Sequence, residues 1–309
     1  MASSSRRWWF WIRASRFEFF TGVIAPTLVG CAVAYDDSGR LHLGLALLTL
    51  LGLLFLHAAA NLANDYFDHL SGNDALNRTF IRPFTGGSRV IQQGLARPRE
   101  VLVASLLSLG LGALLGFILV WLRGLPILVL GLVGGLTGFF YTAPPLKLGY
   151  RGLGEIFLAL DFGVLPVLGA YYVQTQHFSL AALWASLPVA LLILAVLWIN
   201  QFPDYDADRA VGKCHWVVRL GRRRAAWVYC GMVTGSYACV LIAVAAQILP
   251  PLSLLVALSL PLAAKGMNVA LAEYDTPARL APANAATVGL HLTFNLLLTL
   301  GLVVDRLLR

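Results

Sequence analysis

The sequence predicts an all-α integral membrane protein with about nine transmembrane helices around a central cavity. Of its 309 residues, 59% are hydrophobic and only 12% are charged, and the mean hydropathy is +0.76. Soluble domains carry about 25% charged residues. Long apolar runs recur along the chain, and basic residues alternate in density between successive connections. These observations exclude an ordinary soluble globule.

Nine apolar runs account for the expected crossings. A bilayer core of ~30 Å requires roughly 20 residues of helix. We expect the whole chain, 1–309, to form one domain, in which 63–100 and 200–224 are long cytoplasmic loops. The apolar runs span residues 17–35, 42–62, 101–122, 125–143, 153–174, 178–199, 225–247, 251–271 and 285–304.

The segment 1–16 interleaves basic and aromatic side chains. No uninterrupted apolar core precedes a small-residue cleavage site, so a removable signal peptide is not expected. Aromatic side chains at headgroup depth and arginines near anionic lipid favour a segment that lies at the membrane interface. A disordered tail is the alternative. The side chains concerned are Arg6, Arg7, Arg13, Arg16, Trp8, Trp9, Phe10 and Trp11.

The distribution of Lys and Arg predicts the orientation of the chain. Cytoplasmic connections of membrane proteins are enriched in these residues. With the N-terminus in the cytoplasm and the C-terminus outside, 19 of the 23 basic residues lie inside, and only Arg40, Arg123, Arg306 and Arg309 lie outside. Topology therefore explains the net charge of +8, and no nucleic-acid partner is expected. We expect a multi-pass protein of the cytoplasmic (inner) membrane, in contact with membrane lipid.

Two acidic clusters follow the second and the sixth apolar runs. In each, polar residues repeat at helical spacing, so they share one face if the preceding helix continues. An even number of helices separates the clusters, which places both on the cytoplasmic side, where they can face each other across a cavity. The first face carries Asn61, Asn64, Asp65 and Asp68, and the second carries Asn200, Asp204 and Asp208.

Facing carboxylates repel one another, so a positive group must lie between them. Mg²⁺ prefers hard oxygen ligands and is usually held by one or two carboxylates together with substrate phosphates. Ordinary solvated loop charges are the alternative. A calcium loop over 204–215 is disfavoured, because Arg209 and His215 stand where Gly and Glu are required. Nearby basic residues that can complete a diphosphate pocket are Arg78, Arg82, Lys147, Arg151, Arg209 and Lys213.

At these residues the chain resembles the UbiA superfamily of intramembrane prenyltransferases. The hallmarks of that family are an NDxxD first motif and a DxxxD second motif, which correspond here to residues 64–68 and 204–208. The likeness extends to residues 11–16, 83–91, 141–147 and 212–221. It covers most of the chain through the seventh apolar run.

The resemblance implies transfer of a prenyl group from a prenyl diphosphate, with Mg²⁺ as cofactor. Metal ions and cationic side chains neutralise charge that grows as the allylic C–O bond ionises, and an aromatic wall stabilises the allylic cation. The implied catalytic residues are Asp65, Asp68, Asp204, Asp208, Lys147 and Tyr141. The metal site adds Asn61, Asn64 and Asn200 to the four aspartates, and the diphosphate site comprises Arg78, Arg82, Lys147, Lys213 and Arg209.

Within the family, residues 61–68 and 86–91 resemble the menaquinone branch, which implies 1,4-dihydroxy-2-naphthoate as the aromatic acceptor. Residues 214–216 and Phe17 depart from that branch. Prenylation of hydroxybenzoate, haem, chlorin or a glycerol phosphate lipid therefore stays open.

Three residues are expected at the acceptor: Arg89, Arg151 and Asp161. Asp161 lies inside an apolar run, where a charge is costly and usually functional. A secondary transporter is the alternative from another class. It is disfavoured because both acidic clusters lie at helix ends rather than near the bilayer midplane.

Overall fold

The computed structural model of the protein describes residues 10–309. Every regular element in this range is a helix. The expected interfacial segment lies partly outside the described residues, which begin with a helical turn at Phe10. Ala14 is buried beside Leu62 and Val101, and Phe10 and Trp11 pack against the same cluster. The described part of this segment therefore contacts the protein core.

Eight helical spans within the described chain are long and apolar enough to cross a membrane. Five are single helices: α3 (Leu43–Ser71), α5 (Pro98–Arg123), α9 (Leu180–Ala210), α11 (Arg222–Ala245) and α13 (Ala281–Leu308). Three are composite: η1 (Phe17–Phe19) with α2 (Thr21–Ser38); α7 (Gly154–Ala159), η3 (Leu160–Val164) and α8 (Leu165–Thr175); and η4 (Pro251–Ser259) with α12 (Leu260–Glu273).

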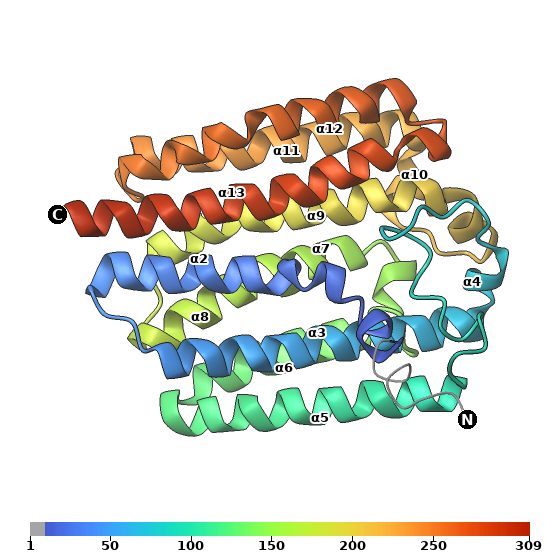
Figure 1. Cartoon of the computed structure of the whole chain (residues 1–309), viewed down its shortest axis with the longest axis horizontal. Coiled ribbons are helices and arrows are strands. Elements are labelled where there is room, and N and C mark those ends of the chain that lie inside the picture. The colour runs from blue at the N-terminus through green and yellow to red at the C-terminus, as the bar shows by residue number, and fades with distance from the viewer. Residues whose placement is uncertain (1–9) are drawn as a thin grey trace.

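The fourth expected crossing corresponds to α6 (Leu125–Phe139), whose 15 residues make it shorter than the apolar run 125–143. It ends early because residues 140–143 form a turn. α5 and α7 both begin at the end of the bundle that carries α4 (Asn73–Leu76) and α10 (Trp216–Leu220), so α6 must return the chain between them (Figure 1). The described chain thus passes along the bundle nine times, as predicted.

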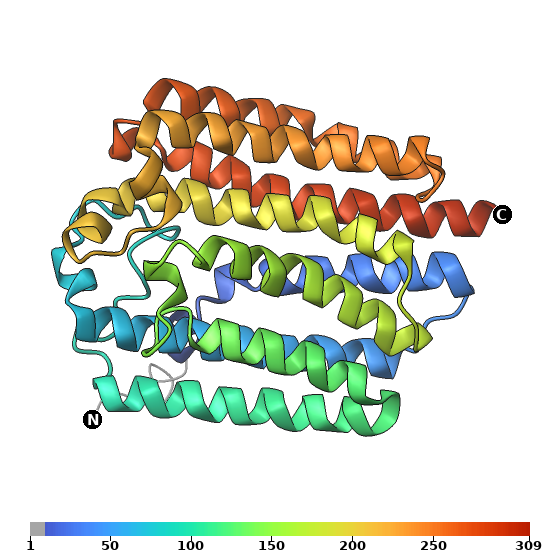
Figure 2. The ribbon, with the colours of Figure 1, turned by 180° about the vertical axis from the view of Figure 1, so that it is seen from behind.

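The helices form one elongated bundle (Figures 1 and 2). α3 packs along α5, and α13 packs against α2, α9 and α12, while α11 and α12 form an outer layer. Large buried side chains in the main core cluster include Leu192, Phe202, Tyr229 and Phe294. The C-terminus lies at the end of the bundle opposite α4 and α10.

The acidic motifs lie on helices rather than in loops, which corrects the predicted loop boundaries. α3 continues to Ser71 and α9 to Ala210. Hydropathy falls at residue 63 and again at residue 200 because a polar face begins there, but the backbone hydrogen bonding of the helix does not depend on hydropathy. The expected loops 63–100 and 200–224 are therefore shorter, and each contains a small helix, α4 or α10.

The composite span of α7 and α8, which is the fifth of the nine passes, is interrupted by η3, a π-helical turn. Gly163 lies in this turn, directly against α9. A Cβ atom there would come within 2.3 Å of Ala190 Cα. Only glycine therefore allows this approach. π-helical turns inside α-helices often occur at functional sites, and this one carries Asp161.

Candidate functional site

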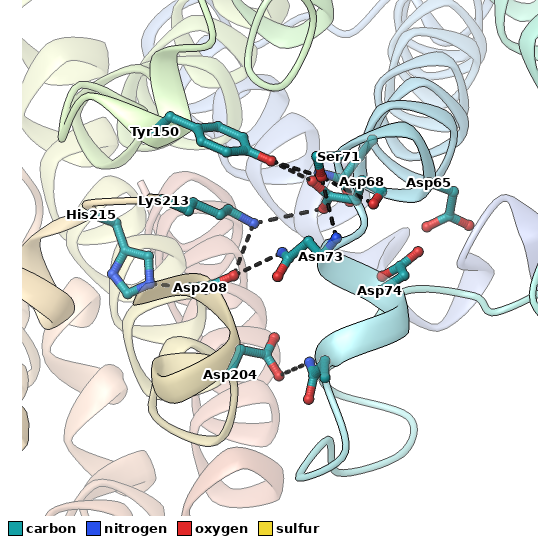
Figure 3. A network of polar contacts seen from close by, with 12 residues as sticks. Asp65, Asp68, Ser71, Asn73, Asp74, Tyr150, Asp204, Asp208, Lys213 and His215 are labelled. Carbon is teal, nitrogen blue, oxygen red and sulfur yellow. Dashed lines mark hydrogen bonds and ion pairs between the residues drawn. The ribbon is translucent and has the colours of Figure 1, made fainter. Parts of the chain in front are cut away.

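The two acidic motifs face each other at one end of the bundle. Asp65 and Asp68 lie in the last two turns of α3, and Asp204 and Asp208 lie in the last two turns of α9 (Figure 3). Asp65, Asp68 and Asp208 are buried. Both motifs continue the preceding helix, which is the condition under which their spacing places polar residues on one face.

Lys213 lies between the two motifs. Its Nζ is 3.6 Å from Asp68 Oδ2 and 3.6 Å from Asp208 Oδ1 (Figure 3). Burial by itself lowers the pKa of Lys213, but the facing carboxylates of Asp208 and Asp68 outweigh it and raise the pKa well above its ordinary value. An ammonium group thus supplies the positive charge that facing acids require.

Arg16 gives the first motif a second cation. Its Nη2 is 2.6 Å from Asp65 Oδ1 and donates to Asn64 Oδ1 at 3.0 Å. The Ser88 hydroxyl donates to the same carboxylate. Gly87, at φ +72°, passes so close that a Cβ atom would lie 3.1 Å from Asp65 Oδ1. Glycine is needed at this position both for its left-handed backbone and for space.

Two amides from the segment after α3 join the motifs to each other. Asn73 Nδ2 donates to Asp208 Oδ1 at 2.8 Å, and Asn77 Nδ2 donates to Asp204 Oδ1 at 2.7 Å. Both asparagines are buried. The sequence analysis missed them, although their i, i+4 spacing directly after the first motif was a usable signal.

His215 orients Asp208 from the other side. Its Nδ1 accepts from the backbone N–H of Val218 at 3.3 Å, at the start of α10. The ring proton must therefore be on Nε2, which donates to Asp208 Oδ2 at 2.9 Å. The third acid of the second motif, Asp206, points outward and pairs with Arg222 at 2.8 Å.

A cavity of about 220 Å³ opens beside these acids and extends into the bundle. Among the described residues, several predicted site residues line it: Asn61, Asn64, Asp68, Tyr141, Asp161, Asn200, Asp204, Asp208 and Lys213. Arg16, Asn73, Asp74 and Asn77, which were not predicted, line it too. Asp65 does not, because it faces Arg16 and Ser88.

The remaining predicted basic residues do not line this cavity. Arg89 donates to the backbone carbonyls of Gly86, Asp74 and Asn77, so it connects different parts of the segment that follows α3. Arg151 donates to the carbonyl of Pro145. Exposed residues that do not line the cavity are Arg78, Arg82, Lys147 and Arg209.

Asp74 lies next to the first motif. Gln92 donates to its Oδ2 at 2.9 Å. Burial, reinforced by Asp68 and Asp65, raises the pKa of Asp74 to about 7. Burial also raises the pKa of Tyr141. Both shifts favour the uncharged form of the side chain.

The donor set suits a hard divalent cation, although the acids are spread around Lys213. Within residues 10–309, no three His, Cys, Asp or Glu side chains converge closely enough to hold an ion by themselves. Asn73 Oδ1 is buried beside Asp208 and has no hydrogen-bond partner in the described part of the chain. Carboxylate and amide oxygens fit Mg²⁺, which takes only one or two protein carboxylates when substrate phosphates complete its coordination.

Comparisons with known proteins identify the family of the chain. The sequence profile of the UbiA prenyltransferase family matches residues 23–297. The 2-carboxy-1,4-naphthoquinone phytyltransferase of Synechocystis sp. is 30% identical over 293 residues, covering 94% of this chain and 92% of that protein. The 1,4-dihydroxy-2-naphthoate octaprenyltransferase of Escherichia coli is 30% identical over 302 residues, covering 96% of each.

A solved structure shares the fold. The UbiA homolog from Archaeoglobus fulgidus bound to GPP and Mg²⁺ has a TM-score of 0.63 at 16% sequence identity. The match covers 94% of this chain and 99% of that chain.

Proposed function

The chain belongs to the UbiA prenyltransferase family and is a multi-pass membrane enzyme, and we propose that it transfers a polyprenyl group from a prenyl diphosphate to 1,4-dihydroxy-2-naphthoate in menaquinone biosynthesis, with Mg²⁺ as cofactor. The observation that carries the proposal is the pair of acid and amide faces at the mouth of a cavity that turns apolar inside. Family membership removes the transporter alternative.

The residues proposed to hold Mg²⁺ are Asp65, Asp68, Asp204 and Asp208, with Asn61, Asn64 and Asn200 beside them. When bound, the metal would neutralise the diphosphate and polarise its bond to the allylic carbon. Asn200 Oδ1 already accepts from Asn284 Nδ2 at 2.7 Å, which fixes the orientation of its amide. The UbiA homolog of A. fulgidus has been solved with GPP and with DMAPP, each with Mg²⁺.

Lys213 and Arg16 are the cations best placed to bind diphosphate oxygens. Both line the cavity, and both pair with motif carboxylates. We propose that, when substrate and metal bind, these two side chains release the carboxylates and bind the diphosphate instead. Because the site is shielded from water, their charges stabilise the leaving diphosphate more than they would in solution.

The prenyl chain requires an apolar path away from the acids. A second cavity, of about 130 Å³, lies between α3, α5, α6 and α8 and adjoins the first. Glycines of α6 line it, at positions 131, 134, 135 and 138. Tyr141 lines the first cavity and Phe139 the second, so aromatic side chains border the path proposed for the allylic end and the prenyl chain.

The acceptor assignment rests on the similar proteins named above. The Synechocystis and E. coli proteins both act on bicyclic naphthalene derivatives, and each is 30% identical to this chain over nearly its whole length. An electron-rich ring is a good trap for an allylic cation. Holding the ring near the allylic carbon before ionisation favours its attack over that of water.

A panel assay tests the proposal. The purified protein is given one prenyl diphosphate, with Mg²⁺ or with excess chelator, and dihydroxynaphthoate, hydroxybenzoate or a glycerol phosphate. Mass spectrometry should show prenylated naphthoate only when Mg²⁺ is present. Efficient prenylation of another acceptor and none of naphthoate would refute the acceptor. Full activity in chelator would refute the metal.

A further inference from the structure

Two cavities meet deep inside the bundle. One opens at the acidic motifs, and the other is the apolar cavity between α3, α5, α6 and α8. Two polar side chains, His57 and Asp161, line both cavities at their junction, together with Phe162. The mechanism proposed above uses neither polar group.

His57 is held in place but has no hydrogen-bond partner among the described residues. Its side chain is buried, and both ring nitrogens lack a partner. Phe20 and Phe162 contact the ring edge-to-face, at centroid distances of 5.4 and 5.2 Å. A neutral imidazole offers one donor and one acceptor, and burial without a partner is unfavourable for both. The site therefore presents an oriented donor and acceptor to the cavity.

Asp161 presents a carboxylate at the same junction. Both of its oxygens lie 2.8 Å from the Thr137 hydroxyl. One hydroxyl carries one proton, so this contact leaves one carboxylate oxygen able to accept another hydrogen bond. Asp161 also lies in the π-helical turn η3, inside a membrane-spanning segment. Acidic side chains at such depth are rare and usually mark functional sites.

We propose that His57 and Asp161 form a subsite that binds a ring hydroxyl group of the aromatic acceptor. The inference rests on the proposed function and specifies which part of the acceptor is recognised. A prenyl chain is a hydrocarbon and satisfies neither side chain. A diphosphate is drawn to Lys213 and Arg16 at the other end of the cavity. A phenolic hydroxyl both donates and accepts, so it matches a carboxylate oxygen and a neutral imidazole.

The position of His57 agrees with this role. It precedes Asp65 by eight residues on α3, which places it roughly 12 Å deeper along the helix. A ring held at this depth by its hydroxyl would lie beside the prenyl chain that continues into the apolar cavity, with its opposite edge toward the diphosphate end, where the allylic carbon lies. The subsite therefore fixes the orientation of the ring before ionisation.

Steady-state kinetics with matched acceptors test the subsite. The variants are His57→Phe, which keeps the aromatic packing and removes both nitrogens, and Asp161→Asn, which keeps the shape and removes the charge. His42→Phe makes the same change at the outer end of α3, remote from both cavities, as a control. The acceptors are 1,4-dihydroxy-2-naphthoate and the two monohydroxy-2-naphthoates that lack one or the other hydroxyl.

We expect each subsite variant to lower kcat/KM for the dihydroxy acceptor about tenfold, the effect of one lost hydrogen bond to a buried group. The loss should shrink to within about twofold for the acceptor that lacks the bound hydroxyl. The KM for prenyl diphosphate and the Mg²⁺ dependence should not change. His57→Gln, which restores a donor and an acceptor, should recover part of the loss.

Three results would overturn the subsite: equal losses with all acceptors, a raised KM for prenyl diphosphate, or wild-type kinetics in both variants. Thermal unfolding in detergent identifies a variant that is merely misfolded. The kinetics of the other variant then decide whether the subsite exists. If the wild-type protein prenylates no hydroxynaphthoate, the proposed acceptor is wrong, and the proposed subsite is wrong as well. If it does and only the variants behave unexpectedly, the proposed function stands.

Discussion

The two acidic motifs both repeat at helical spacing, but their surroundings differ. Asp65 of the first motif is enclosed by Arg16, Ser88 and the Gly87 backbone, outside the cavity lining. Asp204 and Asp208 of the second motif both line the cavity. Asp65 is thus held by the neighbouring loop and the N-terminal segment, whereas Asp68, Asp204 and Asp208 all face the cavity.

This difference shows that a shared helical periodicity does not imply equal roles for the acids. Helical periodicity places four acids on two facing surfaces, but the partners of each acid decide whether it is free to bind a ligand. Asp65 pairs with Arg16 outside the cavity lining, so its removal affects the attachment of the N-terminal segment as well as chemistry. Asp208 pairs with Lys213 and His215 but lines the cavity, so its removal acts directly on the substrate site.

The largest predicted effect is the loss of turnover when a motif aspartate is replaced. The two motifs should differ in how far the replacement also lowers the unfolding temperature. Asp208→Asn should lower kcat by on the order of 10³-fold or more, because several kcal/mol of charge stabilisation is lost, while the thermal unfolding temperature falls less than in Asp65→Asn, because Lys213 keeps Asp68 as a counter-charge. Asp65→Asn should abolish turnover and also lower the unfolding temperature, because it leaves Arg16 without its counter-charge. Activity assays and thermal unfolding in detergent measure both effects. Equal unfolding temperatures for the two variants would contradict the comparison.

A smaller effect is expected from the amides that join the motifs. Asn73→Ala and Asn77→Ala should each weaken the apparent affinity for Mg²⁺ by roughly 10–100-fold, as is usual when a hydrogen bond to a ligand carboxylate is lost. Titration of Mn²⁺ by electron paramagnetic resonance measures this directly. Asn77→Asp, which keeps the size but loses the donated hydrogen bond to Asp204, should be no better than alanine. Wild-type affinity in both alanine variants would show that the amides do not position the acids.

The smallest effect is expected at the third acid of the second motif. Asp206 is exposed and pairs only with Arg222 at the surface, and such pairs contribute about 0–1 kcal/mol. Asp206→Asn should therefore change kcat/KM by less than about twofold and serve as a matched control for Asp208→Asn. A loss comparable to that of Asp208→Asn would mean that Asp206 turns into the cavity when substrate binds.

Some residues of the site could not be found from local sequence patterns. Arg16 precedes Asp65 by 49 positions, and Asn77 precedes Asp204 by 127. Their pairing depends on how the N-terminal segment, α3 and α9 pack together. Conversely, Arg78 and Arg209 follow the motifs closely in the expected loops yet remain exposed outside the cavity, because being near in sequence does not determine which way a loop side chain points.

The sequence by itself determined the class of the protein, the nine passes along the bundle and the two helical faces that carry the acids. Each follows from hydropathy or from local helical spacing, which depend on residues close together in the chain. Only the tertiary structure decided which cations and amides reach those acids, and that His57 and Asp161 meet where two cavities join. Those contacts connect distant helices, and their geometry depends on the packing of the whole bundle.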